Sequence, residues 1–281
     1  MRSFYARTIL SAAMIPYFHI PHLDLKIVTI EPFGVLVATG ILLGVYSARK
    51  RAARLGLDPE EAHSLAFWVV VGSFIMAHVV SIVFYFPERL VEAPWKIFFI
   101  WEGISSMGGF LGAFVTSWWY CRKRKLPYLA YADVLVWAVV LGWIFGRMGC
   151  TIAHDHPGMR TDFFLAVRYP GGARHDLGFY EFLFTVLVLY PLTRLLGRKP
   201  RPDGFFLAVV PIVYSPVRFF FDFLRSTDFG NVDPRYWGLT AAQWLCFPMM
   251  GAGIWLLLRV LKNEPRPLTE PEKQQGRGKK K

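Results

Sequence analysis

The segment "GRMGCTIAHDHPG" (residues 146–158) follows directly on the apolar run "VLVWAVVLGWIF" (residues 134–145). An arginine, a cysteine, two histidines and an aspartate therefore stand immediately after a strongly hydrophobic stretch. Buried helices of soluble proteins rarely end in so many ionisable groups, because charged side chains are almost never fully buried without partners. The composition of the whole chain decides which solvent surrounds this segment.

That composition is typical of a polytopic membrane protein. Of the 281 residues, 54% are hydrophobic and only 19% are charged, whereas soluble domains carry about 25% charged residues. A membrane-spanning helix needs about 20 mostly apolar residues. Seven stretches come close to this requirement, namely residues 32–48, 64–85, 97–121, 131–149, 180–196, 204–223 and 237–258. We therefore expect an all-α polytopic membrane protein with about seven transmembrane helices.

The net charge is +12. The positions of the basic residues along the chain indicate its orientation in the membrane. Twenty of the 32 lysines and arginines follow the first, third, fifth and seventh stretches, and ten lie in the segments on the other side. Basic residues gather in cytoplasmic loops, so we expect the N-terminus outside and the C-terminus in the cytoplasm. Anionic membrane lipids are then the expected partners of this charge, and nucleic acid is not.

The chain is expected to form one transmembrane domain, residues 1–262. Residues 263–281 are polar and basic and predict a disordered cytoplasmic tail. Residues 151–179 form the one sizeable extramembrane segment and predict a small head on the outer side. Within it, "FLAVRYP" favours a short strand and "PGG" a turn. Long loops between helices are uncommon without a function.

Ionisable side chains inside the predicted spans need partners, because each costs roughly 3 kcal/mol at the membrane centre. They are Glu102, Asp133, Arg147, Glu181, Arg218 and Asp222. Either they lock helices together as ion pairs or they line a polar cavity for a charged substrate, and we favour the cavity. In "SPVRFFFDFLRS", Arg218, Asp222 and Arg225 share one helix face. The planar guanidinium group of arginine can donate two parallel hydrogen bonds to one phosphate. Arg218 together with Arg147 therefore suggests a lipid phosphate as ligand.

The cysteines and histidines leave a second interpretation open. Three cysteines give no disulfide framework. A zinc site built from Cys150, His154 and His175 is conceivable, but no recognised zinc spacing is present, and we expect no metal and no cofactor. The glycines of "WEGISSMGGFLGAF" (residues 101–114) favour either close helix packing or a groove for lipid.

Six segments, spread over residues 30–259, resemble the prolipoprotein diacylglyceryl transferase family. They are "IEPFGVLVATGILLG", "WEGISSMGGFLGA", "GRMGCTIAHDHPG", "RHDLGFYE", "YSPVRFFFDFLRSTD" and "GLTAAQWLCFPMMGAG". The third resembles the family signature Gly-Arg-x-Gly-Asn-Phe-x-Asn-x-Glu. The matches occur in the family's order.

The resemblance implies a reaction in the bacterial inner membrane. A diacylglyceryl group would pass from phosphatidylglycerol to the cysteine thiol at the end of a prolipoprotein signal peptide, and glycerol phosphate would leave. The implied catalytic residues are Arg147, Arg218, Asp155 and Asp222, and we add His154 and His156 from the outer loop as candidates. The implied substrate-binding residues are Arg147, Arg218, Glu102, Gly108, Gly109, Cys150, Gly158, Tyr214 and Arg225.

The chain departs from the family pattern at several polar positions. Met107 stands where the family has a histidine, Cys150 replaces the signature asparagine, and Asp155 and Asp222 stand where the family has glutamates. A methionine cannot transfer a proton, so His154 or His156 is the expected substitute. Two alternatives remain open here: a protein of the same fold that uses another lipid or acceptor, and a catalytically silent lipid-binding membrane protein.

Overall fold

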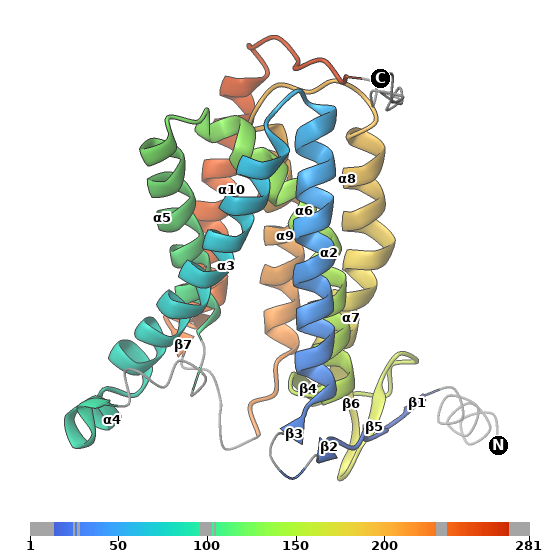
Figure 1. Cartoon of the computed structure of the whole chain (residues 1–281). Helices are drawn as coiled ribbons and strands as arrows, with labels where there is room; N and C mark the ends of the chain where they lie inside the picture. The colour runs from blue at the N-terminus through green and yellow to red at the C-terminus, as the bar shows by residue number, and fades with distance from the viewer. Residues whose placement is uncertain are drawn as a thin grey trace, which may run out of the picture. The chain divides into compact units, whose positions relative to one another are not determined.

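The computed structural model of the chain is mostly helical (Figure 1), and it describes residues 14–24, 26, 29–95, 103, 105–228 and 235–269. The α-helices are α2 (Pro32–Arg54), α3 (Pro59–Val80), α4 (Pro87–Glu92), α5 (Ser106–Arg124), α6 (Tyr128–Ala153), α7 (Leu177–Phe184), α8 (Tyr190–Leu196), α9 (Phe205–Phe221) and α10 (Ala241–Val260). Three short turns of other helix types extend them: η1 (Ser81–Tyr85), η3 (Thr185–Leu189) and η4 (Asp222–Leu224).

Six helices among the described residues are long and apolar enough to cross a membrane. They are Pro32–Arg54, Pro59–Phe84, Tyr128–Ala153, Leu177–Leu196, Phe205–Leu224 and Ala241–Val260. Each overlaps one of the seven predicted stretches, so the prediction of a multi-pass helical membrane protein is confirmed. In the fourth of them, α7 and α8 form one continuous span because η3 joins them without a break in the helix.

The remaining predicted stretch, residues 97–121, is only partly described. Its described part coincides with α5, which begins at Ser106 and continues to Arg124. The last turn of α5 carries three basic residues. Together with the serines and glycines of its first turns, they lower its apolar content relative to the other six helices. The count of seven is therefore approximate.

The chain folds into two compact units, each assembled from separate stretches of sequence. The first comprises residues 1–44, 139–199 and 205–263, and the second comprises residues 45–138, 200–204 and 264–281. Helices α2 and α6 each contribute to both units. The boundary between the units falls after Gly44 in α2 and after Ala138 in α6. The expectation of a single transmembrane domain stays a prediction.

The second unit is built on the close packing of α3 against α5. Gly108 lies so near to α3 that a Cβ atom there would stand 2.5 Å from the carbonyl oxygen of Met76. One turn later, a Cβ atom on Gly112 would likewise collide with the carbonyl oxygen of Gly72. Small residues at this spacing let two helix backbones approach closely in a membrane. The glycine-rich segment therefore serves helix packing at these two positions.

Part of the predicted tail is held against the second unit. The Arg266 guanidinium donates hydrogen bonds to the Asp203 carboxylate at 2.7 and 2.5 Å. The Thr269 amide donates to the Arg54 carbonyl at 2.8 Å. Arg266 and Thr269 thus have fixed partners. Residues 270–281 lie outside the described part of the chain, and their disorder stays a prediction.

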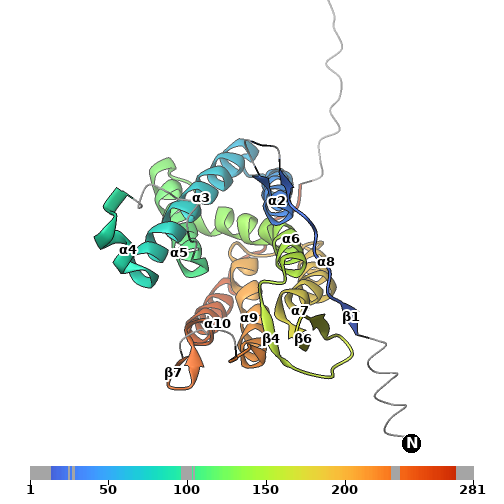
Figure 2. The ribbon, with the colours of Figure 1, turned by 90° about the horizontal axis from the view of Figure 1, so that it is seen from below.

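Short strands form a head at one end of the helices of the first unit (Figures 1 and 2). A four-stranded sheet has the order β1 (Ile15–Pro16), β5 (Val167–Tyr169), β6 (Gly172–Asp176) and β4 (Pro157–Arg160). Two hairpins accompany it, β2 (Leu23–Asp24) with β3 (Thr29–Ile30) and β7 (Arg235–Tyr236) with β8 (Leu239–Thr240). Among the strands of the described residues, only β1 and β5 pair in parallel. The strand and turn expected within "FLAVRYPGG" are confirmed by β5, β6 and the turn between them.

Local capping fixes where two helices next to this head begin. The Asp176 side chain, at the end of β6, accepts a hydrogen bond from the Phe179 amide and starts α7. Thr240, at the end of β8, forms a reciprocal capping box with Gln243 and starts α10. Such caps satisfy amide groups that the first helical turn leaves without partners. They place the ends of α7 and α10 beside the side chains described next.

Candidate active site

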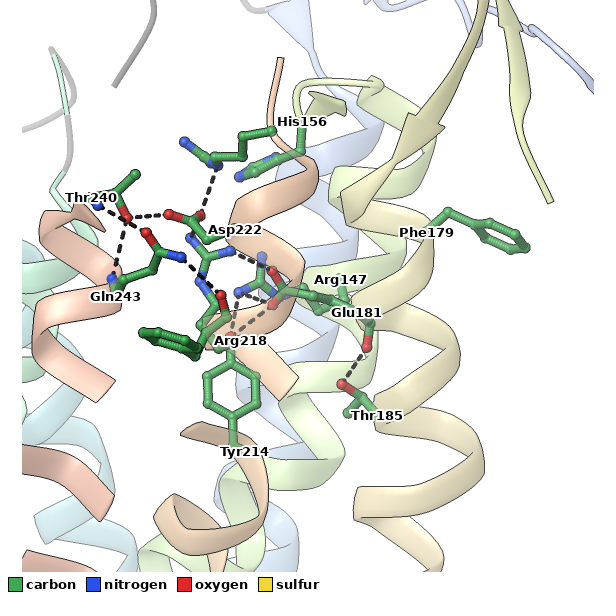
Figure 3. Close-up of polar contacts among 12 residues, drawn as sticks. Arg147, His156, Phe179, Glu181, Thr185, Tyr214, Arg218, Asp222, Thr240 and Gln243 are labelled. Atoms are coloured by element: carbon green, nitrogen blue, oxygen red, sulfur yellow. Dashed lines mark hydrogen bonds and ion pairs between the residues drawn. The ribbon is translucent and has the colours of Figure 1, made fainter. Parts of the chain in front are cut away.

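A row of charged side chains crosses the first unit between α6, α7 and α9 (Figure 3). Arg147 of α6 lies 2.7 Å from the Glu181 carboxylate of α7. Arg218 of α9 lies 3.1 Å from the other oxygen of the same carboxylate. Glu181 therefore holds two arginines from two different helices. The predicted pairing of Arg147 with Arg218 from facing helices is present in the structure.

The row continues beyond α9 through Asp222, the first residue of η4. The Asp222 carboxylate lies 3.1 Å from Arg218 of α9 and 3.1 Å from Arg225. Arg225 follows η4 in an extended conformation, so the expected single helix face ends before it. The second Asp222 oxygen accepts a short hydrogen bond from the Thr240 hydroxyl. Gln243 of α10 donates to the Phe219 carbonyl at 3.1 Å. The first turn of α10 therefore closes one side of the row.

Tyr214 ties the helices together below the carboxylate. Its hydroxyl donates to Glu181 at 2.7 Å and accepts from Arg147 at 3.1 Å. Its ring packs on Trp143 with the ring centroids 4.7 Å apart. A buried tyrosine normally finds a partner for its hydroxyl, and here that partner is the centre of the charged row. Tyr214 thus fixes the carboxylate and the Arg147 fork in one geometry.

The acids of the row are buried, and the arginines are partly open. The side chains of Glu181 and Asp222 are each 1% exposed, whereas those of Arg147, Arg218 and Arg225 are 18%, 16% and 24% exposed. Three guanidinium groups face two carboxylates, which leaves one positive charge in excess among these residues. The accessible side of the row is therefore cationic. A monoanionic group with several oxygens would match it.

A second polar group, which we call the thiol corner, consists of Cys150, Asp155 and His156. One ligand atom from each side chain lies within 4.8 Å of those of the other two. The His156 ring shares a short hydrogen bond with the Asp155 carboxylate. Burial lowers the pKa of His156, but hydrogen bonds to the Asp155 carboxylate and to the Cys150 thiol outweigh it and raise this pKa to about 9. His156 is drawn beside the end of the charged row that carries Asp222 (Figure 3).

His154 lies in a different environment from His156. Its Nδ1 is 2.8 Å from the Asp176 carboxylate, and both side chains are buried. The rings of Tyr17 and Phe18 pack on it at centroid distances of 4.5 and 4.8 Å. Tyr169 donates a hydrogen bond to the same carboxylate at 2.8 Å. His154 thereby connects the residues after β1 with β5 and the cap of α7, and its catalytic part stays a prediction.

Gly158 lets strand β4 approach the end of α9. It forms a bridge with Arg225, and a Cβ atom at this position would stand 2.6 Å from the Leu224 carbonyl oxygen. Nearby, the Arg174 guanidinium donates to the Gly158 carbonyl at 3.1 Å and to the Asp228 carboxylate at 2.9 and 2.5 Å. The hydrogen bonds from Arg174 and Ser226 hold the pKa of Asp228 well below its usual range. The predicted substrate residue Gly158 thus fixes the head to the charged row.

The other predicted site residues belong to the second unit or lie outside the described chain. Glu102 is among the residues that the structure does not describe. Met107 is 38% exposed in the first turn of α5. Gly108 packs on α3, and a Cβ atom on Gly109 would meet no atom within 4 Å. The parts of Glu102, Gly108 and Gly109 in substrate binding stay predictions.

Sequence reasoning missed three residues of the charged row as site residues. The sequence marks Glu181 as an intramembrane acid and as the last residue of "RHDLGFYE", but no local pattern indicates its place between two arginines. Thr240 and Gln243 lie in "GLTAAQW", where the capping-box pattern of a threonine followed three residues later by a glutamine was a usable signal.

These features define a class of protein: a polytopic membrane protein with a cationic, partly buried centre beside a thiol–carboxylate–imidazole group. The profile of the prolipoprotein diacylglyceryl transferase family matches residues 22–259. The chain belongs to this family.

Curated relatives carry the name phosphatidylglycerol–prolipoprotein diacylglyceryl transferase. The protein from Nitrosomonas europaea is 32% identical over 260 residues, which cover 88% of this chain and 93% of that protein. The protein from Chromohalobacter salexigens is 31% identical over 243 residues, covering 83% and 91%. The protein from Pseudoalteromonas atlantica is 31% identical over 254 residues, covering 86% and 91%. The resemblance inferred from the sequence segments is therefore confirmed.

Proposed function

We propose that this protein transfers the diacylglyceryl group of phosphatidylglycerol to the cysteine thiol of prolipoproteins. The names of its relatives give the two substrates. The observation that carries the proposal is the excess positive charge of the row, which is exposed only at its arginines. A phosphodiester bears one negative charge and several acceptor oxygens, so it complements this charge and geometry.

The lipid phosphate is held by Arg147 and Arg218. Glu181 lies between them and keeps each guanidinium in a fixed orientation. A planar fork fixed in this way offers two parallel N–H donors to phosphate oxygens, which an ammonium group cannot do. Asp222 fixes Arg225 in the same way at the end nearer the head. The acyl chains of the lipid would extend among the apolar helices.

The reaction moves negative charge onto the group that these arginines hold. The acceptor sulfur forms a bond to the terminal glycerol carbon of the diacylglyceryl group. The bond between that carbon and the phosphate oxygen breaks, and its electron pair leaves with glycerol phosphate. The phosphodiester monoanion thus becomes a phosphomonoester dianion. Fixed donors aimed at developing charge stabilise the transition state more than the ground state, so the row lowers the barrier.

The acceptor thiol has to lose its proton, because the thiolate is the nucleophile and a free thiol has a pKa of about 8.5. We place this step at the thiol corner. The Asp155 and His156 side chains are 42% and 24% exposed, so an acceptor can reach them. Asp222 contacts two arginines and Thr240, and the His154 side chain is buried against Asp176. The thiol corner is therefore the better candidate for activating the acceptor thiol.

The signal peptide of the precursor would present its cysteine from the membrane, and no nucleic acid takes part. The proposed location is the bacterial inner membrane, with the N-terminus outside and the C-terminus in the cytoplasm. The distribution of basic residues supports this orientation. It would put the strand-bearing end, and with it the charged row, near the outer leaflet, where a secreted precursor arrives.

The test is lipidation in vitro with the full chain in detergent. The acceptor is a synthetic peptide with one lipobox cysteine, and the donor is a vesicle of phosphatidylglycerol. We expect a mass increase of one diacylglyceryl group on the peptide and release of glycerol phosphate. A peptide with alkylated cysteine should give no product. Absence of product with the free thiol, or equal product from vesicles of phosphatidylcholine alone, would overturn the proposal.

A further inference from the structure

The three side chains of the thiol corner have the composition of a zinc site. Cys150 offers a thiolate, His156 an imidazole nitrogen and Asp155 a carboxylate oxygen, and these ligand atoms lie within 4.8 Å of one another. Thiolate, imidazole and carboxylate are the three ligand types of protein-bound zinc. The set differs from the one that the sequence suggested, because His154 is bound to Asp176 and His175 is 2.9 Å from the Tyr180 hydroxyl.

The backbone brings the three ligands together through a reversal after α6. His154, the first residue beyond that helix, has φ of 50°, in the left-handed region. This conformation is uncommon for a residue with a side chain, and the buried contact with Asp176 holds it in place. The chain therefore turns at once, so that Asp155 and His156 come back toward Cys150 in the last turn of the helix.

The start of α7 fixes both ends of the corner. The Leu177 amide donates a hydrogen bond to the His156 carbonyl at 3.0 Å. Gly178 lies against Cys150 so closely that a Cβ atom there would stand 3.1 Å from the Cys150 Cβ. Cys150 and the backbone of His156 are thus held by a single helix turn. A metal site needs ligands that are positioned before the ion binds.

Charge and access fit a metal ion as well. A divalent cation with one thiolate and one carboxylate is neutral overall, so it can lie near Arg147, three residues before Cys150, without net repulsion. Cys150 is nearly buried, and the opening of the corner lies on the side of Asp155 and His156. Three protein ligands leave the fourth tetrahedral position for a substrate, as in catalytic zinc sites.

We propose that Cys150, Asp155 and His156 bind a Zn²⁺ ion whose fourth position is open. Its role rests on the proposed function: the acceptor thiol enters the fourth position. A thiol that coordinates a metal gives up its proton, which here passes to solvent. The sulfur electron pair then forms the bond to the glycerol carbon, and the phosphate oxygen leaves with the electrons of the broken bond.

Metal binding is tested directly on the full chain, purified without a histidine tag. We expect close to one equivalent of Zn²⁺ by elemental mass spectrometry. After exchange with Co²⁺, we expect a thiolate-to-cobalt charge-transfer band in the near-ultraviolet. Cys150→Ser should abolish the band. His156→Gln and Asp155→Asn should weaken metal affinity by about 100-fold or more, since loss of outer-shell partners alone costs 10–100-fold.

Two matched variants separate this site from other cysteines and histidines. Cys121→Ser changes a buried cysteine of the second unit, and His63→Gln changes an exposed histidine of α3. Both should keep the Co²⁺ band. No Co²⁺ band in the wild type, or a band unchanged in Cys150→Ser, would overturn the site.

Chelation distinguishes failure of the metal site from failure of the proposed function. We expect the chelator to stop lipidation and added Zn²⁺ to restore it. Full lipidation by metal-free protein would overturn the metal's role and leave the transferase proposal intact. Metal bound at the corner without any lipidation by the metal-loaded protein would overturn the transferase proposal and leave the site.

Discussion

The Glu181 carboxylate lies 2.7 Å from Arg147 on one side and 3.1 Å from Arg218 on the other. In a membrane, this single buried acid lets two arginines stand close together although their charges repel. Removing one partner of a buried pair leaves an uncompensated charge. Glu181 therefore supports the fold and also keeps both forks available for an anion.

We expect Glu181→Gln to destabilise the protein by about 3 kcal/mol, the lower end of the cost of breaking a buried ion pair. The isosteric amide keeps the shape but leaves Arg147 without its carboxylate. Thermal unfolding in detergent measures the effect. Tyr214→Phe, which removes only the hydroxyl contacts to the same carboxylate, should cost less. Equal stability of the wild type and Glu181→Gln would contradict the role of Glu181.

Replacement of Arg218 by lysine tests whether geometry matters beyond charge. The lysine keeps the positive charge and loses the planar fork. We expect turnover in the vesicle assay to fall by about 100-fold or more, as for the loss of one transition-state donor. Arg168→Lys, at an exposed position of β5, should leave turnover unchanged. Near-normal turnover of Arg218→Lys would show that its fork is not used.

Substitutions of His154 and His156 should have different effects, one on stability and the other on turnover. His154→Gln removes a buried contact to Asp176 in the head, so it should lower thermal stability. His156→Gln changes a partly exposed side chain of the thiol corner, so it should lower turnover by about 10²–10⁴-fold, the usual contribution of assisted proton transfer, with little loss of stability. Lipid binding should persist in His156→Gln. The reverse pattern, with turnover lost mainly in His154→Gln, would place the chemistry elsewhere.

The head should carry an acid-sensitive contact between Arg174 and Asp228. Because its folded-state pKa is lowered, Asp228 contributes stability that is present above its ordinary pKa and is lost as the pH falls below it. We expect Asp228→Asn to unfold at a lower temperature than the wild type at pH 7. The difference in unfolding temperature between the two proteins should become smaller as the pH falls below about 4. A difference that stays constant with pH would argue against the ionised contact.

Orientation can be tested with a reporter that is active only outside the cytoplasm. Fused after Lys262, just beyond α10, it should be silent, because the basic residues at that end favour the cytoplasm. The same reporter joined within residues 161–165 of the head should be active. Strong activity of the fusion after Lys262 would reverse the predicted topology.

The sequence by itself determined the membrane class, six of the expected spans and the family. Those follow from composition and from short motifs, and each depends only on residues near one another in the chain. It also identified Arg147, Arg218, Asp222 and Arg225, because arginines and acids inside apolar stretches stand out. The helix spacing of the last three was readable, since an α-helix places every fourth residue on one face.

The tertiary structure decided which of these groups meet. In the sequence, Glu181 is one of several intramembrane acids. The packing of α6, α7 and α9 places it between two arginines. His154 and His156 are two residues apart in the chain, yet a left-handed residue after α6 sends one to Asp176 and the other to Cys150 and Asp155. Such pairings are set by contacts between distant segments and by one backbone angle, which no local pattern of residues specifies.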